Sequence, residues 1–196
     1  MEITDLNVSF ENKKIFSGFS TEFPDIGTIT LMGNSGCGKT TLLRVIAGLE
    51  KRYSGKITGT QNKKISFVFQ EDRLLPWLSV EKNVSLVADE GFDVRGCLDR
   101  LGIGKEINSV PGLLSGGMKR RVEIARALAF CPDIILLDEP FNGLDQSAKQ
   151  NAAKTISEFC KQSLVLLVTH DRSEAELMKS DIFLLDGPPV SSLVKL

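Results

Sequence analysis

The segment ITLMGNSGCGKTTL, residues 29–42, joins an apolar run, a glycine-rich loop and the start of an amphipathic stretch. Within it, residues Gly33 to Thr40 fit the pattern GxxxxGK followed by Ser or Thr. In phosphate-binding loops this pattern lies between a strand and a helix, where glycines let backbone N–H groups surround phosphate oxygens and the helix start attracts the same anion. The segment therefore predicts a strand, a phosphate-binding loop and a helix at the beginning of an α/β fold.

Each polar position of this loop has an expected contact. The Lys39 ammonium should reach the β- and γ-phosphates of a nucleotide, and the Thr40 hydroxyl should ligate Mg²⁺. Cys37 is either a reactive thiol beside Lys39 or a small residue tolerated at a variable position. A glycine-rich turn that matches the pattern by chance is the alternative to the whole interpretation. The residues expected to contact the nucleotide are Gly33, Asn34, Ser35, Gly36, Cys37, Gly38, Lys39, Thr40 and Thr41.

The composition fits one soluble globular domain. The chain has 196 residues, of which 42% are hydrophobic and 25% are charged, with a net charge of −1. Because this balance provides no overall basic field, we expect no nucleic-acid partner. The longest charge-free stretch, residues 26–38, is too short and glycine-rich to span a bilayer, and the N-terminus lacks the features of a secretory signal. The four cysteines form no CxxC pair, which argues against disulfide or zinc frameworks and indicates a reducing, cytoplasmic setting.

Hydrophobic periodicity predicts a largely parallel sheet covered on both faces by helices. Near-continuous apolar runs predict buried strands at residues 29–32, 65–69, 134–137 and 164–168. Amphipathic stretches predict helices at residues 40–49, 119–130, 147–162 and 172–178. Residues up to 30 and residues 54–59 are typical of short antiparallel strands, and residues 71–114 are expected to form a small helical insert.

Polar residues follow the expected strands, and ligands of open α/β sheets bind beyond the carboxyl ends of strands. We expect Asp138 to hold Mg²⁺ through water and Glu139 to polarise or deprotonate an attacking water. Gln70 is suited to orienting water or a metal-bound oxygen. His170, the only histidine, either contacts the γ-phosphate or is structural. These residues and the glycine loop could share one rim of the sheet.

The segment LSGGM at residues 114–118, followed by KRRVEIARAL, resembles the signature motif of ABC-type ATPases. The resemblance implies a P-loop NTPase, RecA-like core that uses ATP and Mg²⁺. Ser115 can cap a helix beginning near Lys119, while Gly116 and Gly117 expose backbone N–H groups. In the family this loop closes over the γ-phosphate bound to a second subunit, so the resemblance implies a head-to-tail homodimer.

The resemblance covers essentially the whole chain, residues 1–196, as a single ATPase domain in which residues 71–114 form a reduced helical subdomain. Phe10 falls where the family stacks an aromatic ring on adenine, although a buried strand aromatic is the alternative. Asp145, in the segment Gly143-Leu144-Asp145, resembles the aspartate that links the two composite sites across the dimer. A helix N-cap is the alternative role for Asp145, and both can coexist.

Residues 70–80, QEDRLLPWLSV, together with the LSGGM signature, look most like importer ATPases of the nitrate, sulfonate and taurine type. This likeness implies transmembrane permease subunits, an extracytoplasmic solute-binding protein and a peripheral position on the cytoplasmic face of the membrane. Trp77 is then either part of the permease interface or buried under the insert. The implied function is coupling of Mg-ATP-driven dimer closure to import of a small anionic or polar solute; a non-transport clamp or regulatory ATPase is the alternative.

Overall fold

A computed structural model describes residues 1–11 and 13–196 of the chain. Its larger sheet has six strands in the order β5-β6-β7-β3-β8-β9, and every neighbouring pair is parallel except β8 and β9. The strands are β3 (Gly27–Met32), β5 (Ile65–Val68), β6 (Ile134–Asp138), β7 (Leu164–Val168), β8 (Asp181–Leu185) and β9 (Leu193–Lys195). The predicted parallel sheet is therefore confirmed.

Strands β6 and β7 are fully buried and consist almost entirely of apolar residues. Such burial is expected where helices cover both faces of a parallel sheet. By contrast, β8 and β9 were not predicted. Strand β9 has only three residues and is mostly exposed, so it has no clear apolar signal. Residues 182–185 of β8, IFLL, do form a continuous apolar run, and this run is the signal that could have predicted the strand.

A second, three-stranded antiparallel sheet has the order β2-β1-β4. Its strands are β1 (Glu2–Phe10), β2 (Lys13–Glu22) and β4 (Tyr53–Thr58). The expected antiparallel subdomain is present, but its first part ends at Glu22 instead of residue 30, because residues 27–30 pair in parallel with β7.

The longer helices lie close to their predicted positions. They are α1 (Lys39–Ile46), α4 (Gly116–Ala129), α5 (Gln146–Phe159) and α6 (Arg172–Leu177). Helix α4 begins at Gly116 instead of near Lys119, because the Ser115 hydroxyl accepts a hydrogen bond from Met118 N at 3.3 Å and caps the helix there. Asp145 caps α5 in the same way, accepting from Ala148 N at 2.9 Å.

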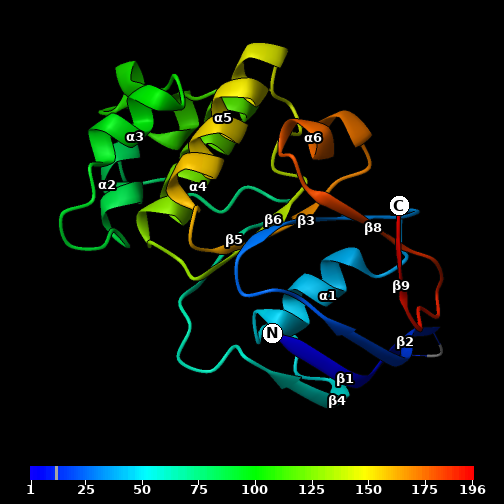
Figure 1. Cartoon of the computed structure of the whole chain (residues 1–196). Coiled ribbons are helices and arrows are strands. Elements are labelled where there is room, and N and C mark those ends of the chain that lie inside the picture. Colours follow the sequence, from blue (N-terminus) through cyan, green and yellow to red (C-terminus); the bar gives the residue numbers. More distant parts are fainter. Residues whose placement is uncertain (12) are drawn as a thin grey trace.

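Two hydrophobic cores lie on opposite faces of the larger sheet. Figure 1 shows α1 between this sheet and the antiparallel sheet, with α4, α5 and α6 on the other side. Side chains alternate between the cores along β6: Ile134 and Leu136 pack with α1 and the small sheet, and Ile135 and Leu137 pack with α4 and α5. The alternation fixes the register of the strand, and with it the position of the residues at its carboxyl end.

The segment of residues 71–114, expected to be a helical insert, contains α2 (Val80–Ser85), α3 (Val94–Arg100) and the 3₁₀ turns η1 (Gly104–Glu106) and η2 (Pro111–Leu113). Its apolar residues, including Val80 and Leu98, join the core around α4. Asn83 is fully buried and donates hydrogen bonds to the carbonyls of Leu75 and Leu78 at 3.1 and 3.0 Å. The amide thereby fixes the segment that leads from Gln70 into the insert.

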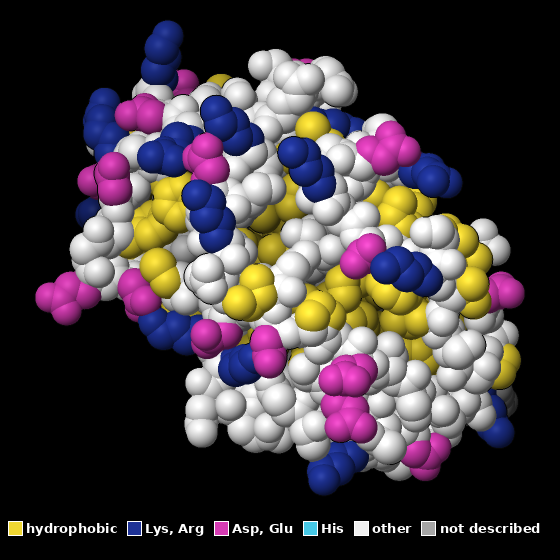
Figure 2. Space-filling view, in the orientation of Figure 1, with side chains coloured by type: hydrophobic (Ala, Val, Ile, Leu, Met, Phe, Trp, Pro, Cys, Tyr) yellow, Lys and Arg dark blue, Asp and Glu magenta, His cyan; other side chains and the backbone are white. Residues whose placement is uncertain are grey.

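The surface carries both signs of charge. Figure 2 shows Lys and Arg side chains interspersed with Asp and Glu over the face in view. Trp77 is 72% exposed, which contradicts the alternative that it is buried under the insert. Among the described residues, none of the helices has the length and apolar character that crossing a membrane requires.

Candidate nucleotide site

The loop between β3 and α1 depends on glycines whose backbone leaves no room for a side chain. A Cβ added at Gly33 would lie 2.5 Å from the Leu185 carbonyl oxygen, and one at Gly38 would lie 2.6 Å from a methyl of Ile15. Their φ angles, 150° and 112°, fall in the region that favours glycine. These two glycines therefore let the loop backbone pass close to Leu185 and Ile15, and both glycines line the cleft described below.

The Lys39 side chain folds back over the loop that precedes it in the chain. Its Nζ donates to the carbonyls of Gly33 and Asn34 at 2.8 and 3.0 Å, and lies 3.8 Å from Cys37 Sγ. Cys37 is only 1% exposed, which favours the tolerated small residue over the reactive thiol. A lysine ammonium has three donors, so an arriving phosphate oxygen can replace the weak sulfur contact without breaking the loop.

Asp138 ends β6 as a buried carboxylate that is 2% exposed. Burial raises the pKa of its carboxyl, while a hydrogen bond from Thr40 acts in the opposite direction. A carboxylate and a hydroxyl in contact are hard oxygen donors of the kind that Mg²⁺ prefers. A cation bound here would favour the ionised form of Asp138, so these residues fit the metal.

Glu139 and His170 face each other from the ends of β6 and β7. The Glu139 backbone has a φ of 51°, a strained value for a residue with a side chain, and its N–H donates to Val168 O at 2.9 Å. Glu139 Oε1 lies 3.1 Å from His170 Nδ1. This hydrogen bond, followed by the charge of Glu139, raises the pKa of His170. The imidazole is 79% exposed and so remains accessible to a ligand.

One cleft of about 510 Å³ joins these groups. Gln70 also lines it, so the residues predicted to share one rim of the sheet do lie together. The predicted residues in its lining are Gly33, Ser35, Gly36, Gly38, Lys39, Thr40, Thr41, Gln70, Asp138, Glu139 and His170. Three further residues, Ile15, Asn142 and Val168, complete the lining but were not predicted to belong to the site.

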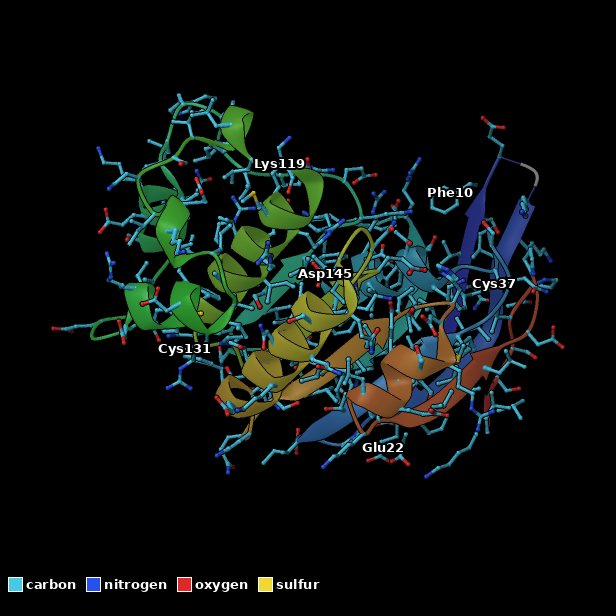
Figure 3. The ribbon with its side chains drawn as sticks, turned by 90° about the horizontal axis from the view of Figure 1, so that it is seen from above. Phe10, Glu22, Cys37, Lys119, Cys131 and Asp145 are labelled. Carbon is cyan, nitrogen blue, oxygen red and sulfur yellow. The ribbon has the colours of Figure 1, made fainter. Side chains whose placement is uncertain are left out.

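The other predicted residues lie outside this cleft lining. Asn34 contributes its carbonyl to Lys39, and Phe10 is half-buried with the Arg52 guanidinium 5.0 Å from its ring centre. Figure 3 shows Phe10 beside the strands of the antiparallel sheet, apart from Lys119 on α4 and from Asp145 near the middle of the view.

The signature loop opens on a second hollow of the surface. Ser115, Gly116, Gly117 and Asp145 line it together with Arg121 and residues 143–144. A Cβ at Gly117 would lie 2.7 Å from the Gly143 carbonyl oxygen, so this glycine lets the two loops approach. The predicted nucleotide-binding residues are thus divided between two surface sites of one chain.

Comparisons with known proteins give the same assignment. The family model described as ABC transporter matches residues 16–142. The aliphatic sulfonates import ATP-binding protein SsuB 2 of Pseudomonas syringae pv. tomato is 40% identical over 166 residues, covering 82% of this chain and 71% of that protein. The bicarbonate transport ATP-binding protein CmpC of Synechocystis sp. is 39% identical over 90% of this chain, which spans 29% of CmpC.

A solved structure agrees with the fold. The ATP-binding cassette MJ0796, described as a dimeric post-hydrolysis state bound to ADP and Pi, superposes with a TM-score of 0.83 at 26% sequence identity, covering 100% of this chain and 97% of that one. The matched family model includes the phosphate loop, the signature motif and the Asp138–Glu139 strand end. The chain therefore belongs to the ABC transporter family and is one of its ATP-binding, ATP-hydrolysing proteins.

Proposed function

We propose that this chain is the Mg-ATP-hydrolysing subunit of an importer for a small anionic solute and that it acts as a head-to-tail dimer. The observation that carries the proposal is the division of the site residues. Lys39, Asp138 and Glu139 line one cleft, while Ser115 and Asp145 line a different hollow. A second copy could place its signature hollow over the nucleotide of the first, so that both clefts are completed together.

In each cleft the loop amides and Lys39 would hold the β- and γ-phosphates. Thr40, Asp138 and Gln70 supply the oxygen donors that would hold Mg²⁺. When bound, Mg²⁺ neutralises charge on the β- and γ-phosphate oxygens. The cleft thus joins a phosphate cradle to a separate set of metal-binding oxygens.

In the proposed reaction Glu139 would accept the proton of the attacking water as that water bonds to the γ-phosphorus. The bond from the γ-phosphorus to the bridging oxygen breaks, and ADP and inorganic phosphate are released. The protonated form of His170, which the hydrogen bond with Glu139 favours, would donate to a γ-phosphate oxygen. Loss of the γ-phosphate removes contacts that favour the closed dimer and allows it to open.

The proposed partner proteins are inferred from the similar proteins named above and from one exposed residue, Trp77. The similar proteins named above are import or transport subunits for aliphatic sulfonates and bicarbonate, both anionic solutes. We infer a transmembrane permease that contacts the region of Trp77, an extracytoplasmic solute-binding protein, and a peripheral position on the cytoplasmic face of the membrane. An exposed tryptophan favours an interface because it combines a large apolar surface with a hydrogen-bond donor.

Crosslinking tests the proposed dimer directly. In a Cys131→Ser background, which removes the exposed native thiol, Ser35→Cys and Ser115→Cys would be combined with Glu139→Gln. We expect ATP to produce a disulfide between two chains, with little crosslink in its absence. A matched variant that replaces Ser115→Cys with Ser157→Cys on α5 controls for random collision. Equal crosslinking of both cysteine pairs would contradict the composite site.

Association with membrane subunits separates transport from a non-transport clamp. Co-expression with the permease should give a complex whose ATP hydrolysis rises when a solute-binding protein loaded with an alkanesulfonate or bicarbonate is added. A chain that stays free of permease and hydrolyses ATP only with a non-membrane partner would support the clamp instead.

A further inference from the structure

We infer that Arg120 is a positioning residue that holds Gln70 at the nucleotide cleft and attaches it to the signature helix. This inference rests on the proposed function, because it gives Gln70 a role with Mg-ATP. Arg120 lies on α4 and its side chain is only 7% exposed. A buried guanidinium requires partners for its charge and its N–H groups, and here those partners are on the Gln70 segment and on α4.

The contacts form a fork around the Gln70 main chain. Arg120 Nη2 donates to the Gln70 carbonyl at 2.6 Å, and Nη1 donates to the Phe69 carbonyl. Glu123, one turn along α4, pairs with Nη1 at 3.1 Å and accepts a hydrogen bond from the Arg73 N–H at 2.5 Å. One buried ion pair thus contacts the main chain at Gln70, at the residue before it and three residues after it.

The fork replaces hydrogen bonds that the sheet does not provide. Strand β5 is an outer strand of the larger sheet, paired with β6 alone, and it ends at Val68. Beyond that point the carbonyls of Phe69 and Gln70 bond to Arg120. Fixing the main chain of Gln70 fixes where its side chain starts, so Arg120 sets the distance from the amide to the metal-binding oxygens.

The same helix carries the signature loop. Ser115 caps α4, and Arg120 lies in its second turn. A displacement of Gln70 on binding Mg-ATP would therefore be transmitted through Arg120 to the signature loop, which serves the nucleotide of the second copy. Planar guanidinium geometry suits this task, because a lysine ammonium cannot reach two carbonyls and a carboxylate in one fixed fork.

Arg120→Lys tests the inference because it keeps a cation for Glu123 but removes the fork. In the full chain we expect ATP turnover to fall about 10- to 100-fold, the range seen when groups supporting a metal ligand are removed. Half-saturating Mg²⁺ should rise, while ATP binding measured without Mg²⁺ should be unchanged. Adding Gln70→Ala to Arg120→Lys should cause little further loss, since both changes act on one group.

Ser163→Ala is the matched control, because it also removes a buried hydrogen bond but lies away from Gln70. Ser163 Oγ donates to the Pro132 carbonyl at 2.7 Å at the start of β7, the end of that strand opposite His170. This variant should lower the melting temperature without changing the Mg²⁺ dependence. An Arg120→Lys variant that behaves like this control, or an additive loss with Gln70→Ala, would overturn the inference.

Hydrogen exchange distinguishes failure of this inference from failure of the proposed function. In Arg120→Lys we expect faster exchange at the amides of residues 69–73 and unchanged exchange in α1. Unchanged exchange at residues 69–73 would overturn the fork while leaving the ATPase assignment intact. If exchange speeds up but wild type shows no Mg-dependent hydrolysis, the proposed function fails, and the positioning role fails with it.

Discussion

Glu139 Oε1 and His170 Nδ1 are 3.1 Å apart, so the candidate general base shares a hydrogen bond with the only histidine in the chain. The two residues come from the ends of adjacent parallel strands, where Asp138 pairs with Val168 in the β6–β7 register. The pairing of these strands therefore places a carboxylate beside an imidazole and raises the pKa of that imidazole. This relationship can be measured before any nucleotide is added.

The single imidazole signal in an NMR titration should report a pKa above the ordinary value of 6.5, because Glu139 stabilises the protonated ring. The Glu139–His170 pair stabilises the folded state at low pH, where the imidazole is protonated. This stabilisation is lost as the pH rises through the raised pKa of His170. Glu139→Gln should move the midpoint down toward 6.5. An unchanged midpoint in that variant would mean that the two side chains do not interact in solution.

Glu139→Gln should also retain ATP and accumulate a closed dimer. The phosphate loop is unaffected, but the water loses its proton acceptor, so turnover should fall by about 10²- to 10⁴-fold. Gel filtration with ATP and Mg²⁺, with wild type as the control, would detect the dimer. Steady hydrolysis at the wild-type rate would contradict the assigned role.

Lys39→Ala should weaken ATP binding itself. Removing a charged hydrogen-bond donor to phosphate costs about 1.5–3 kcal/mol, or roughly 10- to 100-fold in affinity. Calorimetric titration would measure this loss, and Lys161→Ala, an exposed lysine beyond α5, controls for the change in net charge. Equal affinity in both variants would remove Lys39 from the site.

Asp138→Asn should raise the melting temperature of the nucleotide-free chain while abolishing Mg-dependent turnover. Burial raises the pKa of the carboxyl, so its charge at neutral pH opposes folding, and asparagine can still accept the Thr40 hydrogen bond. Asp186→Asn, an exposed change after β8, should leave the melting temperature unchanged. A lower melting temperature for Asp138→Asn than for wild type would contradict this electrostatic argument.

Trp77→Ala should reduce co-purification with the permease without changing stability beyond about 0.5 kcal/mol, because the side chain is 72% exposed. Val194→Ala, an exposed apolar change on β9, is the matched control and should leave co-purification intact. Equal permease recovery with both variants would place the interface elsewhere.

The central strands and the grouping of residues at the cleft could be predicted from the sequence, because each of their signals lies within a short segment. An apolar run followed by Asp138 and Glu139, or by His170, is visible within ten residues, and parallel pairing then brings the strand ends together. The Arg120 fork was not predictable in the same way. Phe69 and Arg120 are 51 positions apart, and nothing near either residue specifies the other. Similarly, Ile15 and Asn142 enter the cleft through packing of separate segments.

The alternation along β6 has a consequence for how substitutions act. Leu136 faces the layer that contains α1, which follows the phosphate loop, whereas Leu137 faces the layer that contains α4 and α5, whose N-terminal ends line the hollow proposed to bind a second copy. Two neighbouring residues of one strand therefore pack beneath different sites, one beneath the nucleotide cleft and the other beneath the signature hollow. Substitutions that leave a cavity at these two positions should therefore have different effects. A cavity at Leu136 should weaken nucleotide binding, whereas a cavity at Leu137 should weaken association of two subunits.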